Sequence, residues 1–220
     1  MTQSNGKTIG TRARRIEDPN LLRGRATFVD DIHLSGLLHV AFVRSPHPHA
    51  RLHGIDAAAA KALPGVHAVF TLDDFRPHIT MDRLPLQFPS QSIPPGSTPW
   101  LLAGDEVCHV GEAVAMVVAD SRYIAEDAAL LVEVDYGTLP SVVGAAASAA
   151  PGAPVARNGR ADNVLVRISQ AYGDTDAAFA SAHGVFSACL VQHRGGAHPI
   201  EGRGCVARYD ALDDRLTLWS

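Results

Sequence analysis

The chain has 220 residues, of which 46% are hydrophobic and 19% are charged, and its formal net charge is −4. This is ordinary globular composition, enough for one large domain or for one domain and part of another. The charge balance gives no general attraction to nucleic acid or to an anionic membrane. No stretch approaches roughly eighteen uninterrupted apolar residues, so we expect no membrane span.

The 3 cysteines are too few and too scattered for a disulfide framework. They contain no Cys-x-x-Cys pair, so we expect no zinc ribbon or iron–sulfur site held within this chain. The polar N-terminus lacks the apolar segment of a secretory signal, and a cytoplasmic protein is therefore expected.

The first part of the chain predicts one strand–helix–strand unit. Residues 1–18 are expected to be a disordered or extended lead-in. An apolar run at 37–43 indicates a strand, and an alanine-rich helix is predicted at 55–63, ending at Pro64 and Gly65. A second strand is predicted at 66–72.

Residues 76–100 contain six prolines and show little periodicity. A proline-rich connection of this length is unusual inside a compact domain. We expect it to be either a lid or a surface that a neighbouring chain covers.

A second strand–helix–strand unit is predicted further along the chain. The apolar run at 113–119 suits a strand buried on both faces. Asp120 or Ser121 can cap the following helix, and residues 132–136 alternate as a half-buried strand does. The apolar positions of the helix recur at i, i+4 and i+7, namely Ile124, Ala128 and Leu131. Two such units predict a sheet with helices laid against it.

Residues 144–160 are rich in Ala, Gly and Pro and indicate a linker. A short helix is predicted from Asp174 or Thr175 through Ala182. Three strands are predicted after it, at 185–191, 205–209 and 215–219. Three strands and one short helix bury too little surface for an independent core. We therefore expect this region to open a domain that continues elsewhere, so that the chain completes no chemistry alone.

Arg44, His47 and His49 lie in a proline-containing loop directly after a predicted strand. Two histidines two positions apart can ligate a metal. The remaining histidines are scattered, so hydrogen bonding or contact with a partner chain is the favoured interpretation, and no metal ligand is expected.

The stretch 193–204 is the most informative part of the sequence. The adjacent Gly195 and Gly196 let the backbone approach a bulky ligand closely. Charged and titratable groups surround them, namely Arg194, His198, Glu201 and Arg203. The residue chemistry alone leaves two interpretations open, a functional loop or glycines that turn the chain. The spacing Gly202-x-Gly204-x-x-Ala207 is like a dinucleotide fingerprint, but these glycines lead into a strand and not a helix, so we reject it.

An ordered series of motifs runs through essentially the whole chain. It opens with Arg15-Ile16-Glu17-Asp18-Pro19 and Leu21-Leu22-x-Gly24, and includes Phe42-Val43-Arg44-Ser45-Pro46-His47. Further members lie at 63–66, 110–115, 126–129, 132–140, 173–179 and 193–204. This series resembles the large subunit of the molybdenum hydroxylases, the family of carbon monoxide dehydrogenases, xanthine dehydrogenases and aldehyde oxidases. An agreement of this extent is far more specific than any single motif.

The resemblance implies an α+β fold in successive parts. An α/β hammerhead domain is expected at 19–143, after an N-terminal extension at 1–18. A linker at 144–160 is expected to lead to the first strands of an incomplete molybdopterin-binding domain at 161–220.

The resemblance also implies a chemistry. Family enzymes hydroxylate carbon with oxygen from water, on aldehydes, purines, N-heterocycles or similar small molecules. A molybdenum–molybdopterin dinucleotide takes the electrons, and partner subunits carrying 2Fe-2S clusters and FAD pass them on. The family's catalytic glutamate, its Gly-Gly-Gly-Phe-Gly loop and most of its pterin contacts have no counterpart here. A further chain that carries the rest of the molybdopterin-binding subunit is therefore an expected partner.

The resemblance assigns candidate residues as well. In many members a glutamine six residues before the glutamate matching Glu201 hydrogen-bonds the molybdenum oxo group, and here that position is Gly195. Gly195 and Gly196 are accordingly the candidates near the cofactor, and no catalytic residue is expected. The partner-facing or loop candidates are Arg44, His47, His49, Arg194, His198 and Glu201.

The leading hypothesis is a subunit or fragment of a molybdenum hydroxylase that is not catalytically complete alone. One alternative is a non-catalytic assembly or binding module that keeps the hammerhead fold. Another is a truncated gene product that retains the fold.

Overall fold

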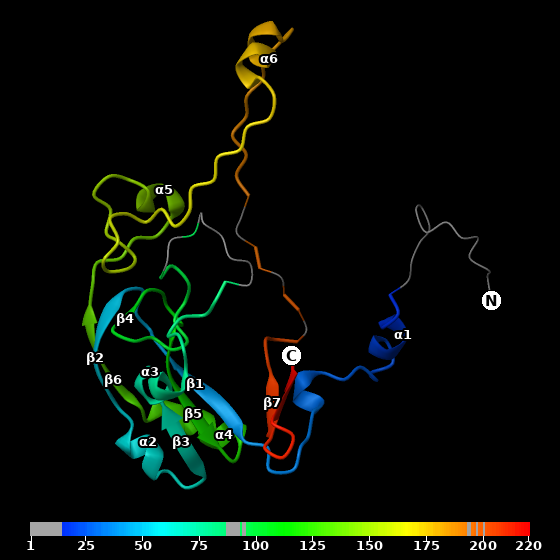
Figure 1. The fold of residues 1–220 in the computed structure, drawn as a ribbon, viewed down its shortest axis with the longest axis vertical. Coiled ribbons are helices and arrows are strands. Elements are labelled where there is room, and N and C mark those ends of the chain that lie inside the picture. The colour runs from blue at the N-terminus through cyan, green and yellow to red at the C-terminus, as the bar shows by residue number, and fades with distance from the viewer. Residues whose placement is uncertain (1–14, 87–92, 94–95, 193–194, 197, 200) are drawn as a thin grey trace, which may run out of the picture. The chain divides into compact units, whose positions relative to one another are not determined.

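The computed structural model describes residues 15–86, 93, 96–192, 195–196, 198–199 and 201–220. The chain divides into two compact units, which are described separately (Figure 1). One comprises residues 37–185, and the other combines residues within 1–36 with residues 186–220.

The first sheet of the 37–185 unit has the strand order β1-β5-β3. It consists of β1 (His39–Arg44), β5 (Ala113–Ala119) and β3 (Val66–Phe70), all paired antiparallel. The helices α2 (Ala58–Ala62) and α4 (Arg122–Leu130) contact this sheet. Their small side chains allow close packing, and the buried cluster contains Ala60, Val69, Ala115, Val117, Ala128 and Val132.

The second sheet has the strand order β4-β2-β6. Its strands are β4 (Glu106–Val107), β2 (Ala50–Asp56) and β6 (Glu133–Thr138), and again the pairing is antiparallel. A second buried cluster, formed by Ala50, Ala103, Val107 and Val114, packs with side chains from β2 and β6. Val114 comes from the central strand of the first sheet, so β5 contributes side chains to both clusters.

Short helices complete this unit. They are α3 (Leu72–Phe75), the 3-10 helix η2 (Arg76–His78), α5 (Ala145–Ser148) and α6 (Thr175–Ser181). The predicted start of α6 is confirmed, because the Asp174 side chain accepts a hydrogen bond from the backbone N–H of Ala177 at 2.9 Å. No helix among the described residues is both long and apolar enough to cross a membrane.

The other unit holds α1 (Asp18–Leu21), the 3-10 helix η1 (Val29–Asp31) and the hairpin of β7 (Val206–Asp210) and β8 (Arg215–Trp219). Directly paired residues of an antiparallel hairpin point to the same face. One face therefore carries Ala207, Tyr209, Leu216 and Leu218, and the last three are each more than half exposed.

The strand at 113–119 and the helix that Ser121 caps are confirmed. The Ser121 hydroxyl accepts the backbone N–H of Ile124 at 3.3 Å. The buried face of that helix differs by one position from the prediction, because Ala125 and Ala128 are buried whereas Leu131 is 40% exposed.

Three strand or helix predictions are wrong in whole or in part. Ile55 belongs to β2, and the helix starts only at Ala58, where the Asp56 carboxylate accepts the backbone N–H at 2.8 Å. The strand at 66–72 ends at Phe70, because residue 72 already begins α3. The segment 185–191 is not a strand, although its composition favours one. Its side chains at Phe186 and Val191 are about nine-tenths exposed, and none of the strands in the described part of the chain pairs with it, so no apolar face is buried to favour a strand.

Candidate functional site

The loop that leads into β7 packs against η1. The Glu201 carboxylate accepts the backbone N–H of Val29 at 2.7 Å. A Cβ placed on Gly204 would lie 3.3 Å from Val29 Cγ1, so the two backbones approach closely. This contact forms part of a pocket of about 320 Å³, which is lined by Val29, Glu201, Gly202, Arg203, Gly204 and Ser220.

Gly195 and Gly196 are exposed. A Cβ on Gly195 would meet no atom of the described chain within 4 Å, and one on Gly196 would only touch His198 Cε1 at 3.9 Å. The chain's own packing therefore does not require glycine at either position. His198 is exposed as well, whereas Arg194 lies outside the described residues.

The structure separates the roles of Arg44, His47 and His49. Arg44 is exposed at the end of β1, where it donates to the carbonyl of Gly111 at 2.8 Å. The His47 ring is half-buried against Tyr136, with 4.8 Å between ring centroids. His49 is only 4% exposed, so it makes hydrogen bonds inside the unit and presents no surface to a partner.

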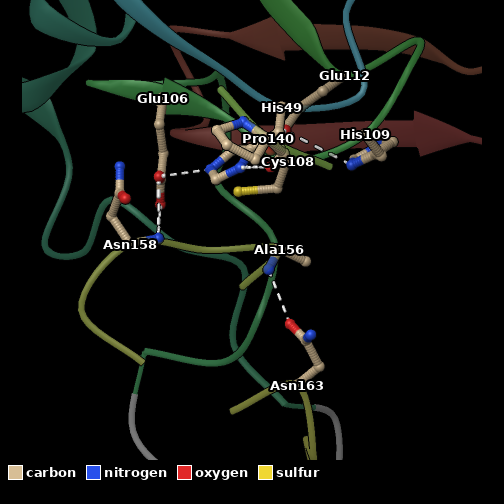
Figure 2. A network of polar contacts seen from close by, with 9 residues as sticks. All are labelled: His49, Glu106, Cys108, His109, Glu112, Pro140, Ala156, Asn158 and Asn163. Carbon is tan, nitrogen blue, oxygen red and sulfur yellow. Dashed lines mark hydrogen bonds and ion pairs between the residues drawn. The ribbon is translucent and has the colours of Figure 1, made fainter. Parts of the chain in front are cut away.

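His49 belongs to a buried polar network that Figure 2 shows. Its Nδ1 lies 3.0 Å from the carbonyl oxygen of Pro140, and its Nε2 lies 3.4 Å from Glu106 Oε2. The His49 and Glu106 side chains are 4% and 5% exposed. The backbone N–H of Asn158 donates to both Glu106 oxygens, at 3.2 and 3.0 Å. One buried carboxylate thus receives groups from the loop between β1 and β2 and from the 144–160 stretch.

A second buried carboxylate, that of Glu112, lies in the connection between β4 and β5. Glu112 accepts the backbone N–H of Cys108 at 2.5 Å and pairs with His109 Nδ1 at 3.5 Å. Its partners are all within four residues, so this carboxylate closes its own turn.

The Cys108 thiol lies between these two carboxylates. Burial, followed by the negative charge of Glu106, raises the pKa of the Cys108 thiol to about 11. Because the thiolate is the nucleophilic form, this cysteine is protected from reaction near neutral pH.

The proline-rich segment, residues 76–100, is held at its described ends. The Arg83 guanidinium carbon lies 3.7 Å from the centroid of the Trp100 ring, and Arg83 Nη1 donates to the carbonyl of Thr98 at 2.7 Å. Burial lowers the pKa of Arg83, and the nearby positive charge of Arg157 acts in the same direction.

The stretch 144–160, expected to be a linker, contains α5 and then a loop that Asn163 closes. The Asn163 carboxamide accepts the backbone N–H of Ala156 at 2.7 Å and donates to the carbonyls of Ser148 and Pro154. We name residues 154–163 the junction loop.

Sequence reasoning missed Glu106, Glu112 and Asn158 as members of buried polar contacts. Glu112 lay within one of the quoted motifs and so carried a signal. Glu106 and Asn158 carried none, because their burial depends on contacts between segments about fifty residues apart.

Two family models match this chain in succession. Residues 23–140 match the aldehyde oxidase and xanthine dehydrogenase a/b hammerhead domain. Residues 157–220 match the molybdopterin cofactor-binding domain. The chain therefore belongs to the aldehyde oxidase and xanthine dehydrogenase family of molybdenum hydroxylases, which confirms the expected family, the expected fold and a molybdopterin group as the cofactor class.

Individual relatives agree with this assignment. The chain is 43% identical over 96% of its length to the nicotine 6-hydroxylase large subunit of Paenarthrobacter nicotinovorans. It is 36% identical, again over 96%, to the carbon monoxide dehydrogenase large chain of Afipia carboxidovorans. The crystal structure of quinoline 2-oxidoreductase from Pseudomonas putida 86 matches 97% of the chain with a TM-score of 0.79 and 42% identity. The chain spans only 25 to 27% of the length of these relatives.

Proposed function

We propose that this chain is one part of the molybdopterin-binding subunit of a molybdenum hydroxylase that oxidises a small molecule with oxygen from water. The observation that carries the proposal is the succession of the two family matches, at 23–140 and 157–220. The chain spans about a quarter of the length of these relatives, and in this proposal the remaining segments, carried by a further chain, supply the rest of the cofactor site and the substrate pocket. In this proposal the chain works in the cytoplasm.

The stretch 193–204, which we name the glycine-rich loop, has backbone and charged groups suited to a pterin dinucleotide. Gly195 and Gly196 expose backbone without a Cβ, through which peptide N–H groups can approach a bulky group. Arg203 is exposed nearby in sequence and supplies a permanent positive charge suited to a phosphate. We assign Gly195 and Gly196 to the side of the cofactor, which itself supplies the redox chemistry.

The domain limits are part of the same proposal. The hammerhead domain occupies 19–143, and the cofactor-binding part occupies 161–220. The proposed partners are the chain that carries the rest of the subunit, a subunit with 2Fe-2S clusters and a subunit with FAD.

Affinity purification of the chain from cells that contain its neighbouring gene products tests the partner proposal. Mass spectrometry should identify a polypeptide with the remaining molybdopterin-binding segments, together with iron–sulfur and FAD subunits. A stable complex without such subunits would support the assembly-module alternative instead, and a chain that purifies only as aggregate would support a truncated product.

A further inference from the structure

The strongest feature outside the glycine-rich loop is the buried carboxylate of Glu106. Three segments far apart in the sequence meet at it: His49 from the β1–β2 side, Pro140 through His49, and Asn158 from the junction loop. Figure 2 shows these groups pointing toward one another. A buried carboxylate is costly unless its oxygens are satisfied, so the contacts must form together.

The hydrogen-bonding rules define the state of His49. The Pro140 carbonyl can only accept, so His49 Nδ1 carries a proton and donates to it. His49 Nε2 faces a carboxylate oxygen at 3.4 Å. The ring therefore lies between the Pro140 carbonyl and the Glu106 carboxylate and contacts both. The contact with this oriented ring helps to hold the Glu106 carboxylate in place.

The fixed carboxylate in turn holds the junction loop. Asn158 donates its backbone N–H to both oxygens, at 3.2 and 3.0 Å, and hydrogen bonds to ionised acceptors are among the stronger ones. Asn163 closes the loop internally. The loop is therefore internally closed, and Glu106 is its contact with β4.

Two arginines of the junction loop extend the chain of contacts. Arg157 Nη1 donates to the carbonyl of Gly96 at 2.7 Å, and Arg160 Nη1 donates to Ser97 Oγ at 3.2 Å. Both acceptors belong to the end of the proline-rich segment. These contacts attach the end of that segment to the junction loop, in addition to the Arg83 hydrogen bond to the Thr98 carbonyl.

We propose that Glu106 and His49 form a latch that holds the junction loop and, through Arg157 and Arg160, the end of the proline-rich segment. Asn158 is the second residue of the cofactor-domain match, which begins at 157, and Glu106 lies within the hammerhead match. The latch therefore anchors the start of the cofactor-binding part to β4. This inference goes beyond the proposed function and does not depend on it.

Amide hydrogen exchange of the 220-residue chain as purified tests the latch. Glu106→Ala should speed exchange at both 155–163 and 96–98 by about 10- to 100-fold, while β5 and α4 stay protected. Glu112→Ala is the matched control, because it truncates a carboxylate of similar burial just after β4, and the side-chain partners of Glu112 among the described residues lie in its own turn. It should leave both segments protected.

A surface variant tests the order of the contacts without touching the buried pair. Arg157→Gln combined with Arg160→Gln should speed exchange at 96–98 about tenfold and leave 155–163 protected. The latch is refuted if Glu106→Ala and Glu112→Ala give the same exchange pattern. It is equally refuted if the double variant releases the junction loop, or if it leaves 96–98 unchanged. Should Glu106→Ala also expose β5, the double variant alone decides.

Discussion

Gly65 gives the sharpest test of the packing between the helices and the first sheet. It lies between α2 and β3 with a φ of +86°, in the left-handed region that favours glycine. A Cβ at this position would lie 2.9 Å from Ile124 Cδ1 and 3.2 Å from Asp120 Oδ2. Gly65→Ala therefore combines backbone strain with a steric overlap at α4.

A control variant at Gly111 separates the effect of backbone strain from that of steric overlap. Its φ is +87°, nearly that of Gly65, but a Cβ there would meet nothing within 4 Å. Gly111→Ala should lower the free energy of unfolding by about 1 kcal/mol through backbone strain alone. Gly65→Ala should lower it by about 2–4 kcal/mol, because overpacking adds about 1–3 kcal/mol.

Urea denaturation followed by far-UV circular dichroism measures both variants against the unmodified chain. The difference between the two alanine variants reports the overlap with Ile124. If Gly111→Ala lowers the free energy of unfolding as much as Gly65→Ala does, Gly65 does not lie in close contact with Ile124 of α4.

Three further predictions concern Cys108 and Ser121. At pH 8, iodoacetamide should modify the exposed Cys189 and Cys205 well before Cys108, and mass mapping of the sites would expose an error if Cys108 reacted equally fast. Folding raises the pKa of the Cys108 thiol from 9.0 to about 11. The contribution of this thiol to the free energy of unfolding is therefore fully present below pH 9.0 and is lost as the pH rises through about 11. Urea unfolding at a series of pH values should show this loss in the unmodified chain and not in Cys108→Ser. Ser121→Ala should lower the free energy of unfolding by about 1 kcal/mol, because it removes the N-cap of α4, whereas Ser121→Asp should retain most of that stability in the same urea assay.

The elements predicted correctly are those whose signals are local and strong. β5 is a continuous apolar run between Glu112 and Asp120, and α4 has both a serine cap and a helical apolar period. β2 was missed because Gly54 and the polar residues around it break the alternation, and the β2–β6 pairing shifts register between Leu52 and Gly54. The alanine-rich run after Asp56 favours a helix, so the helix was predicted to begin at residue 55, whereas α2 begins at Ala58.

The buried polar contacts could not be predicted from sequence. A glutamate between apolar residues has no local signature of burial, and Glu106 is buried only because residues 49 and 158 reach it across the fold. His49 shows the same limit, since its place in a loop with His47 suggested similar roles for two histidines that the fold separates. The glycines at 195 and 196 were noticed from their adjacency and assigned to the cofactor by resemblance, and their role stays a prediction because the packing of the described chain does not require glycine at either position.

The molybdenum content of the purified protein tests the central claim most directly. Elemental analysis by mass spectrometry should find about one molybdenum per copy of this chain in the assembly with its partner subunits, and none in the chain purified alone. Molybdenum retained by the isolated chain, or an intact assembly that contains none, would contradict the account.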